Sequence, residues 1–185
     1  RETKHAREGK PAKIVAKMNS LCDEGIIAAL YEASAAGVEI ELIVRGICCL
    51  KVGIPGISEN IHVRSIVGNF LEHSRIFFFL NDGEEELYMG SADWMPRNLD
   101  RRVEILFPVL DDTLKEKVKH ILDVELADNT KAHVLKPDGE YEKIDRRGKV
   151  LVNSQKQFCE EAVAAVPKTD HVYRERVFVP AEPAE

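Results

Sequence analysis

The segment from Ala12 to Val44 constrains the fold more than any other part of the sequence. It begins with a short apolar run, Ala12 to Met18, that is typical of a strand. Apolar residues then recur at helical spacing from Ile26 to Ala36, and Gly37 predicts the end of that helix. Val38 to Val44 first alternates and then becomes continuously apolar, as in a strand entering a core. Strand, helix and strand at this spacing predict a βαβ unit with two parallel strands.

The start of the predicted helix and the ends of the two strands carry further signals. Ser20, followed three residues later by Asp23, resembles a capping box. Ligands of parallel sheets usually bind at the carboxyl ends of the strands. Lys17 and the Arg45-Gly46 pair fall at those ends, which makes this edge the expected binding edge.

The rest of the chain predicts one α/β domain with a mixed sheet. Strand patterns occur at 61–67, 75–80, 87–91 and 103–109, the last of which is mostly apolar and predicts a central strand. A helix is expected from Asp111 to about Leu126, a hairpin over 131–144, and a helix from Asn153 to about Val166. We therefore divide the chain into a linker or frayed end (1–11), the domain itself (12–150), and a helix with a partly disordered tail (151–185).

Composition excludes several functional classes. The chain has 185 residues, of which 44% are hydrophobic, and no apolar run is long enough to span a membrane. Its net charge of −6 argues against nucleic acid or an anionic membrane as a general partner, so any anion site must be a local basic cluster. The four cysteines form no CxxC pair, and we expect reduced, buried thiols and no metal site. The start at Arg1 and the polar first eleven residues suggest a fragment of a longer protein.

His73 is the candidate reactive group. Imidazole titrates near neutral pH, so it can attack phosphorus or protonate a leaving oxygen. If His73 and Arg75 lie on one strand, they share a face, and Ser91 at the end of the return strand can come close. Asp93 or Glu104 could then hold the far ring nitrogen. A surface or hydrogen-bonded structural histidine is the alternative, and the pattern by itself favours it.

Arginines are the second signal, because a guanidinium group suits forked contact with phosphate oxygens. They fall near predicted strand ends or in the loop after Asp93: Arg45, Arg64, Arg75, Arg97, Arg101 and Arg102. The alternative is a set of surface ion pairs with the neighbouring acidic residues. Gly53-Ile54-Pro55-Gly56 lacks the Lys-Ser/Thr of a P-loop, which argues against a Walker site.

Four long stretches of the sequence resemble a known family. Lys17–Ser20, Ile43–Leu50, Phe70–Ile76 and Ser91–Glu104 are similar to the last catalytic domain of the polyphosphate kinase family. The resemblance covers roughly residues 10 to 145. It implies a phospholipase-D-like half, an α/β fold with a mixed sheet flanked by helices, in residues 12–150. The full enzyme of that family extends inorganic polyphosphate from ATP through a phosphohistidine.

The resemblance also implies roles for particular residues. His73 corresponds to the second-half histidine, a candidate acid/base near the ATP phosphates, and Arg45 to a nucleotide-phosphate contact. Possible supporting or phosphate-contacting residues are Lys17, Arg64, Arg75, Ser91, Asp93, Arg97, Arg101, Arg102 and Glu104. The phosphorylated histidine lies in the preceding domain of the family, so we expect the isolated chain to be inactive.

The same resemblance sets expectations about cofactor and partners. The expected substrates are ATP or ADP and inorganic polyphosphate, and the expected cofactor is Mg²⁺, bound with ATP through ligands outside this chain. The expected partners are the rest of the same polypeptide and further copies of the full-length enzyme in a homo-oligomer. The location would be cytoplasmic or peripheral to the membrane.

Departures from the wider phospholipase-D pattern weaken a phosphodiesterase interpretation. Arg75 stands where lysine is usual, Leu80 where aspartate is usual, and Asp93 where asparagine is usual. Two alternatives nevertheless stay open: a stand-alone half-site protein that dimerises to cleave phosphodiesters, and a polyanion-binding module without chemistry.

Overall fold

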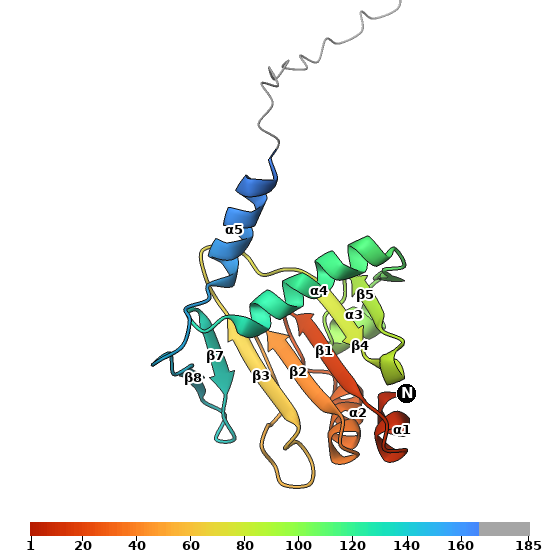
Figure 1. Ribbon diagram of the computed structural model, residues 1–185. Helices are drawn as coiled ribbons and strands as arrows, with labels where there is room; N and C mark the ends of the chain where they lie inside the picture. Colours follow the sequence, from red (N-terminus) through yellow and green to blue (C-terminus); the bar gives the residue numbers. More distant parts are fainter. Residues whose placement is uncertain (167–185) are drawn as a thin grey trace, which may run out of the picture.

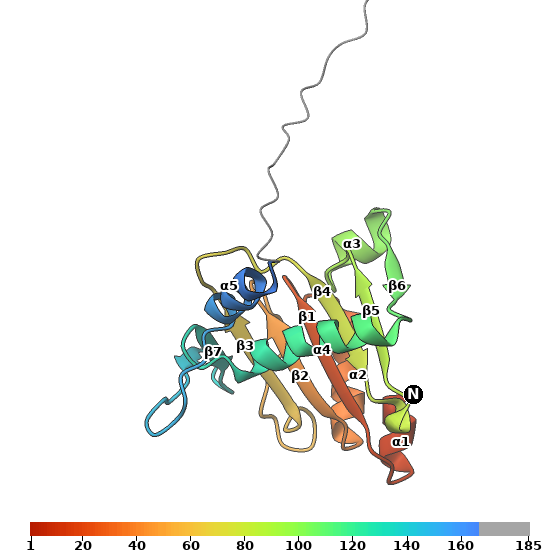
Figure 2. The same ribbon diagram turned by 45° about the horizontal axis from the view of Figure 1, so that its top comes forward.

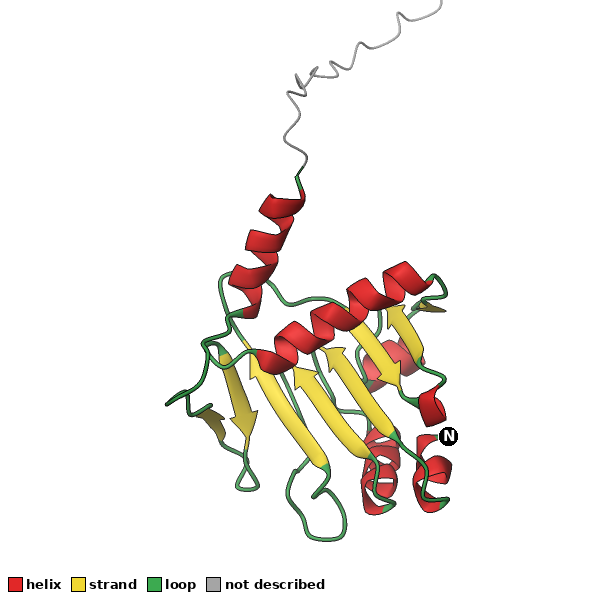
Figure 3. Ribbon diagram, viewed as in Figure 1, coloured by secondary structure: helices red, strands yellow, loops and turns green. Residues whose placement is uncertain are grey.

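The structure, a computed structural model, describes residues 1–166 and is built around one mixed sheet. Its eight strands lie in the order β6-β5-β4-β1-β2-β3-β7-β8. Figure 3 shows the strands of the sheet in yellow and the helices in red. The strands are β1 (Lys13–Met18), β2 (Glu39–Val44), β3 (Ile61–Ile66), β4 (Arg75–Phe79), β5 (Glu86–Gly90), β6 (Leu106–Pro108), β7 (Ala132–Leu135) and β8 (Tyr141–Lys143). The helices are α1 (Glu2–Arg7), α2 (Glu24–Ala35), η1 (Asn81–Gly83), α3 (Pro96–Arg101), α4 (Asp112–Ala127) and α5 (Ser154–Ala165).

The predicted βαβ unit is confirmed as β1, α2 and β2. The two strands are parallel and in register from Lys13 opposite Glu39 to Met18 opposite Val44, and β3 extends the parallel set beyond β2. The N-cap of α2 is Asp23, whose carboxylate accepts a 2.9 Å hydrogen bond from the Ile26 amide, so Ser20 does not open a capping box as predicted.

Two apolar layers cover the two faces of the sheet. Successive side chains of β1 point to opposite faces, so Ile14 and Met18 pack with α2 whereas Val15 packs on the opposite face, with α4. Figure 1 shows α4 lying across one face with α1 and α2 on the other, and Figure 2 shows the same layers from a tilted view. Each fully buried Leu or Ile contributes about 1.5–3 kcal/mol to such a core.

Antiparallel strands complete the sheet on both sides. β4 pairs with β1, with Lys17 opposite Ile76, and β5 returns against β4 through η1. Asn81 and Asp82 adopt positive φ in this turn, a conformation that short polar side chains tolerate. The hairpin of β7 and β8 is also confirmed, and β7 is antiparallel to β3.

The apolar run 103–109 is not a central strand. Only Leu106–Pro108 forms a strand, and β6 lies at the edge of the sheet. Val103 is 99% exposed and Leu106 is 64% exposed. An apolar run does not by itself distinguish a central strand from an edge strand, and Pro108 cannot donate a backbone hydrogen bond on a second side.

Residues 1–11 differ from the predicted linker or frayed end because they contain α1. Glu2 is buried, and its carboxylate accepts hydrogen bonds from the backbone amides of Lys13 (3.0 Å) and Asn81 (2.8 Å). This acidic side chain therefore ties the helix to the sheet. The predicted helix after Asn153 is present as α5, and the predicted tail disorder lies outside the described residues. Within residues 1–166 no helix has the length and apolar character to cross a membrane.

Candidate functional site at the carboxyl edge of the parallel strands

One edge of the sheet gathers most of the predicted site residues. β1, β2 and β3 end at this edge, and because β4 runs antiparallel to β1, it begins there. β5 ends at the same edge, since its Gly90 lies opposite Arg75. The loops that follow β2 and precede β4 therefore lie two strands apart at one end of the sheet, and they carry Arg45 and His73.

Arg45 has a fixed backbone and an available side chain. The Ser65 hydroxyl donates a 2.9 Å hydrogen bond to the Arg45 carbonyl, and the Gly46 amide donates one of 2.8 Å to the Asn19 carbonyl. A side chain at position 46 would place its Cβ 3.1 Å from that same oxygen, which favours glycine there. The Arg45 guanidinium makes no ion pair with an acidic residue in the described part of the chain. It is therefore available to an anionic ligand.

Arg75 is held by a buried carboxylate. Its guanidinium donates to both oxygens of Asp93, at 3.1 and 3.2 Å, and to the His73 carbonyl at 2.8 Å. Asp93 also accepts a 2.7 Å hydrogen bond from the Asn19 amide and is only 6% exposed. Arg75 and Asp93 therefore fix the backbone of His73 and link it to the loop after β1.

The His73 side chain is exposed at this edge, before β4 begins. Among residues 1–166 no side chain forms a hydrogen bond with its ring, so Asp93 and Glu104 do not hold the imidazole as predicted. Both carboxylates are engaged elsewhere. His73 and Arg75 also do not share one strand, because β4 starts only at Arg75. The imidazole is thus open to a ligand while its backbone is restrained.

Lys17 is buried below the edge and is paired with two acids. Its Nζ lies 3.3 Å from Glu72 Oε2 and 3.6 Å from Glu125 Oε1, and only 1% of the residue is exposed. Burial raises the pKa of Glu125 to about 8, against the opposing attraction of Lys17. Burial would also raise the pKa of Glu72, but hydrogen bonds from Gln155 and contacts with Glu125 and Lys17 outweigh it and lower that pKa. At neutral pH, Glu125 is therefore the protonated acid, and Lys17 neutralises Glu72.

Glu104 forms a second polar cluster next to α3. It accepts hydrogen bonds from the Ser91 hydroxyl and, at 2.6 Å, from Asn98 Nδ2, which lower its pKa. Arg102 Nε lies 3.4 Å from the same carboxylate. Ser91, Asn98 and Arg102 thus gather around the Glu104 carboxylate, and none of these contacts involves the His73 ring.

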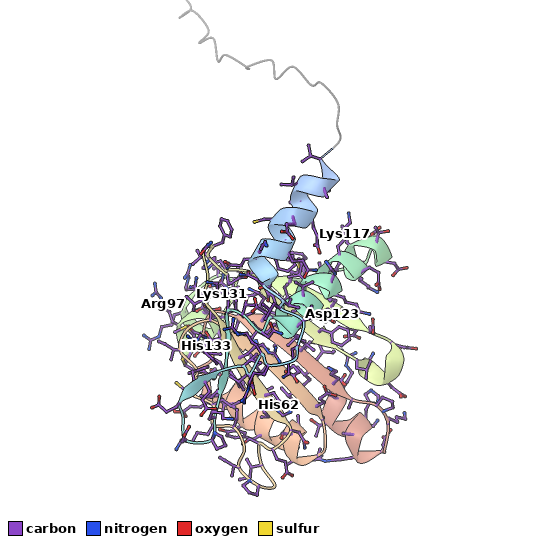
Figure 4. All side chains as sticks on the ribbon, turned by 60° about the vertical axis from the view of Figure 1, so that its left-hand side comes forward. His62, Arg97, Lys117, Asp123, Lys131 and His133 are labelled. Carbon is purple, nitrogen blue, oxygen red and sulfur yellow. The ribbon has the colours of Figure 1, made fainter. Side chains whose placement is uncertain are left out.

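The remaining predicted arginines separate into two groups. Arg97 and Arg101 are exposed on α3 and form no ion pair within residues 1–166, and Figure 4 shows Arg97 at the outer surface. Arg64 instead points to the end of α4, where it donates to the Leu126 carbonyl and lies 3.6 Å from Glu41. Burial lowers the pKa of Arg64. The structure therefore does not bring Arg64 to the His73 cluster.

Several site residues were missed by the sequence analysis: Asn19, Glu72, Asn98, Glu125 and Gln155. Glu125 carried a usable signal, because it is an acid at a core position of an amphipathic helix. Gln155 carried none, since it is 83 residues from Glu72 in the sequence.

Together these features define an α/β domain whose sheet edge presents an exposed histidine and, as far as residues 1–166 are concerned, guanidinium groups without ion pairs, above the buried cluster of Lys17 and Glu125. The chain belongs to the family of the polyphosphate kinase C-terminal domain 2, whose model matches residues 1–155.

Relatives support this membership. The chain is 55% identical over 167 residues to the polyphosphate kinase of Pseudomonas aeruginosa, covering 90% of this chain and 24% of that protein. It is 53% identical over 166 residues to that of Lactiplantibacillus plantarum, covering 90% and 23%. The crystal structure of polyphosphate kinase from Porphyromonas gingivalis superposes with a TM-score of 0.85 at 42% identity, over 88% of this chain and 25% of that one. The chain thus spans about a quarter of these relatives, and the predicted family and fold class are confirmed.

Proposed function

We propose that this chain supplies the ATP- and polyphosphate-binding half of a polyphosphate kinase site. In the full protein, the terminal phosphate of ATP would pass reversibly to inorganic polyphosphate through a phosphohistidine carried by the preceding domain. The observation that carries the proposal is the position of Arg45 and His73, both unengaged by other side chains of residues 1–166, at one edge of the sheet. Family membership supports ATP and polyphosphate as the substrate class proposed for this edge.

Each residue has a distinct part in this proposal. Arg45 binds nucleotide phosphate oxygens through its planar guanidinium group, and the positive charge stabilises the negative charge that accumulates during transfer. His73 donates or accepts a proton at an oxygen of the transferring phosphate. Arg97 and Arg101 extend the basic surface along α3 for the polyphosphate chain. Arg75, Asp93 and Lys17 act on the backbone and surroundings of His73 rather than on phosphate.

Magnesium would enter with ATP. The acidic groups near His73 are already engaged: Asp93 with Arg75, Glu104 with Ser91, and Glu72 with Lys17. Within residues 1–166 no three His, Cys, Asp or Glu side chains come together as metal ligands. The described residues therefore do not fit a resident magnesium site, and we expect the ion to be held by phosphate oxygens and groups outside this chain.

The rest of the same polypeptide is the obligatory partner, the full-length enzyme forms a homo-oligomer, and it acts in the cytoplasm or at the membrane periphery.

The test is synthesis of polyphosphate from ATP by the full-length protein and its variants. We expect His73→Ala and Arg45→Ala each to reduce the rate by at least about a hundredfold, the scale for losing one group that stabilises transferred charge. Arg147→Ala is the matched control, because in the part of the chain that the structure describes Arg147 pairs only with the neighbouring Asp145 on the surface. Full activity of His73→Ala would contradict the proposal.

A second assay distinguishes the other functional classes. The purified chain by itself should not synthesise polyphosphate, and robust turnover would overturn the division of the site between two domains. Cleavage of a phosphodiester substrate by a dimer of the isolated chain, with loss of cleavage in His73→Ala, would favour the nuclease alternative. Phosphate affinity that survives His73→Ala but not Arg45→Ala, without any turnover by the full-length protein, would favour a binding module.

A further inference from the structure

The loop that carries His73 has little apolar anchorage of its own. Residues 67–74 connect β3 to β4, and Phe70 and Leu71 are 60% and 70% exposed. Figure 1 shows this loop passing beside the base of α5 before it reaches β4. Something other than hydrophobic packing must therefore fix its conformation.

Gln155, in the first turn of α5, makes the contacts that do so. Its Nε2 donates to the Phe70 carbonyl at 2.9 Å, and its Oε1 accepts from the Phe70 amide at 3.0 Å. The same Nε2 donates to Glu72 Oε1 at 2.7 Å. The carboxamide thus satisfies both backbone groups of one loop residue and the side chain of another, and it is only 5% exposed.

Glu72 extends this restraint to the residue before His73. One of its carboxylate oxygens accepts from Gln155, and the other lies 3.3 Å from Lys17 Nζ. On the other side, Arg75 holds the His73 carbonyl at 2.8 Å. The backbone is therefore fixed on both sides of an imidazole that is itself free.

The base of α5 is anchored firmly enough to serve as a support. Ser154 donates to Asp128 Oδ2 from both its amide and its hydroxyl, each at 2.8 Å, and Asp128 is fully buried. The fit at the loop is also tight, because a Cβ at Gly68 would lie 2.3 Å from Gln155 Oε1. Only glycine at position 68 leaves the carboxamide in place.

We propose that Gln155 is a positioning residue, which holds the His73 loop in the geometry required for phosphoryl transfer. This inference rests on the proposed function of His73. Gln155 does not touch substrate. A carboxylate could not replace it, because a glutamate there could accept from the Phe70 amide but would face the Phe70 carbonyl and the Glu72 carboxylate without a proton to donate.

The test compares Gln155→Ala and Gln155→Glu with Gln157→Ala in the full-length protein. Gln157 is the matched control, since it lies on the same helix and, within residues 1–166, its side chain bonds only to Glu161. We expect kcat to fall by about tenfold or more in both Gln155 variants, with KM for ATP changed by less than about twofold, because small misplacement affects the transition state more than binding. Gln157→Ala should match the parent protein.

A second readout does not depend on activity. Hydrogen exchange of the amides of residues 68–74 should accelerate in the Gln155 variants and stay unchanged in Gln157→Ala. Gly68→Ala, which displaces the carboxamide from the loop side, should reproduce both effects without altering α5. Unchanged exchange, or faster exchange with an unchanged kcat, would overturn the inference.

The two proposals fail in different ways. If His73→Ala keeps full activity, the proposed function of His73 fails, whatever the Gln155 variants do. If His73→Ala is inactive but Gln155→Ala and Gly68→Ala keep the parent kcat, only the positioning role is wrong.

Discussion

Glu125 lies on the buried side of α4, where its carboxyl group approaches Lys17. Its folded-state pKa is raised to about 8 from an ordinary value near 4.5, chiefly by burial. The folded state therefore retains a proton that the unfolded chain releases. The stabilisation from this proton is complete below about pH 4.5 and is lost as pH rises towards 8.

We expect Glu125→Gln to remove this pH dependence. The variant keeps a neutral side chain of the same shape, so the free energy of unfolding should decline less between pH 5 and 8 than in the parent, by on the order of 1 kcal/mol per pH unit. Urea unfolding at several pH values measures it. Glu116→Gln, on the exposed side of the same helix, should leave the slope unchanged. Equal slopes for Glu125→Gln and the parent would contradict the assignment of the proton.

Lys17→Met should be strongly destabilising. Within residues 1–166 the change removes the cation that pairs with Glu125 and Glu72, and it leaves the Glu72 carboxylate, whose side chain is only 14% exposed, without a compensating charge, which costs about 3–5 kcal/mol. Lys13→Met on the same strand removes only a surface pair with Glu39, so it should cost less than about 1 kcal/mol. Denaturant unfolding of the two variants measures the difference. Equal losses in the free energy of unfolding would show that the Lys17 ion pairs stabilise the fold no more than the surface pair of Lys13.

At the scale of elements, Asp128 joins α4 to both β7 and α5. Its Oδ1 accepts from the amides of Thr130 and Lys131, at 2.9 and 2.8 Å, and its Oδ2 accepts from Ser154. Burial would raise the pKa of Asp128, but these hydrogen bonds outweigh it and lower the pKa. This one side chain therefore fixes the residues that follow α4 and anchors the first residue of α5, Ser154.

Asp128→Ala should loosen α5 and destabilise the domain. Several buried donors lose their acceptor, each costing about 1–3 kcal/mol when it stays unsatisfied. Asp111→Ala is the control, because Asp111 is an exposed N-cap of α4 and should cost about 1 kcal/mol. Thermal unfolding followed by circular dichroism compares the two. A smaller loss for Asp128→Ala than for Asp111→Ala would contradict this view of the junction.

Most elements could be predicted from the sequence because their signals are local. Period and turn residues lie within a few positions of each other, as in β1, α2 and β2, and these three segments were predicted correctly apart from the N-cap of α2, which is Asp23 and not Ser20. The edge position of β6 and the presence of α1 depend on distant contacts: Glu2 caps an amide at position 81, and nothing nearby in the sequence indicates that. The hydrogen bonds between Gln155 and the loop that carries His73 could not be predicted for the same reason.

At the scale of the whole molecule, an acidic chain is proposed to bind a polyanion. The chain's net charge of −6 opposes the approach of a polyanion, whereas Arg45, Arg97 and Arg101 are proposed to attract phosphate at one edge. Local attraction must therefore exceed long-range repulsion, and added salt screens both.

We expect polyphosphate binding by the full-length protein to weaken as salt rises, and Arg45→Gln to weaken it further with a shallower dependence on salt. Each lost phosphate contact reduces the number of counterions exchanged on binding. Titrations at several ionic strengths measure the slope, with Arg147→Gln as the surface control. A slope unaffected by Arg45→Gln would remove that residue from the binding surface.

The site could be predicted only in part at this scale. His73 and Arg45 could be recognised because they lie next to strand ends, within stretches of sequence that resemble the polyphosphate kinase family. Whether a given arginine faces a ligand or another side chain depends on the assembled sheet, which turns Arg64 towards the end of α4 and commits Arg75 to Asp93. Charge and spacing do not encode that choice.

The central place of β1 also has a consequence for biosynthesis. This strand leaves the ribosome before both of its neighbours, yet it lies between β2 and β4. It can pair with β2 once residue 44 has emerged from the ribosome, whereas its other edge stays unpaired until residue 79 has emerged. During that interval an apolar strand has an unpaired edge, which is the form most prone to misassociation with other nascent chains. Chaperone dependence during translation should therefore be greatest between those two points.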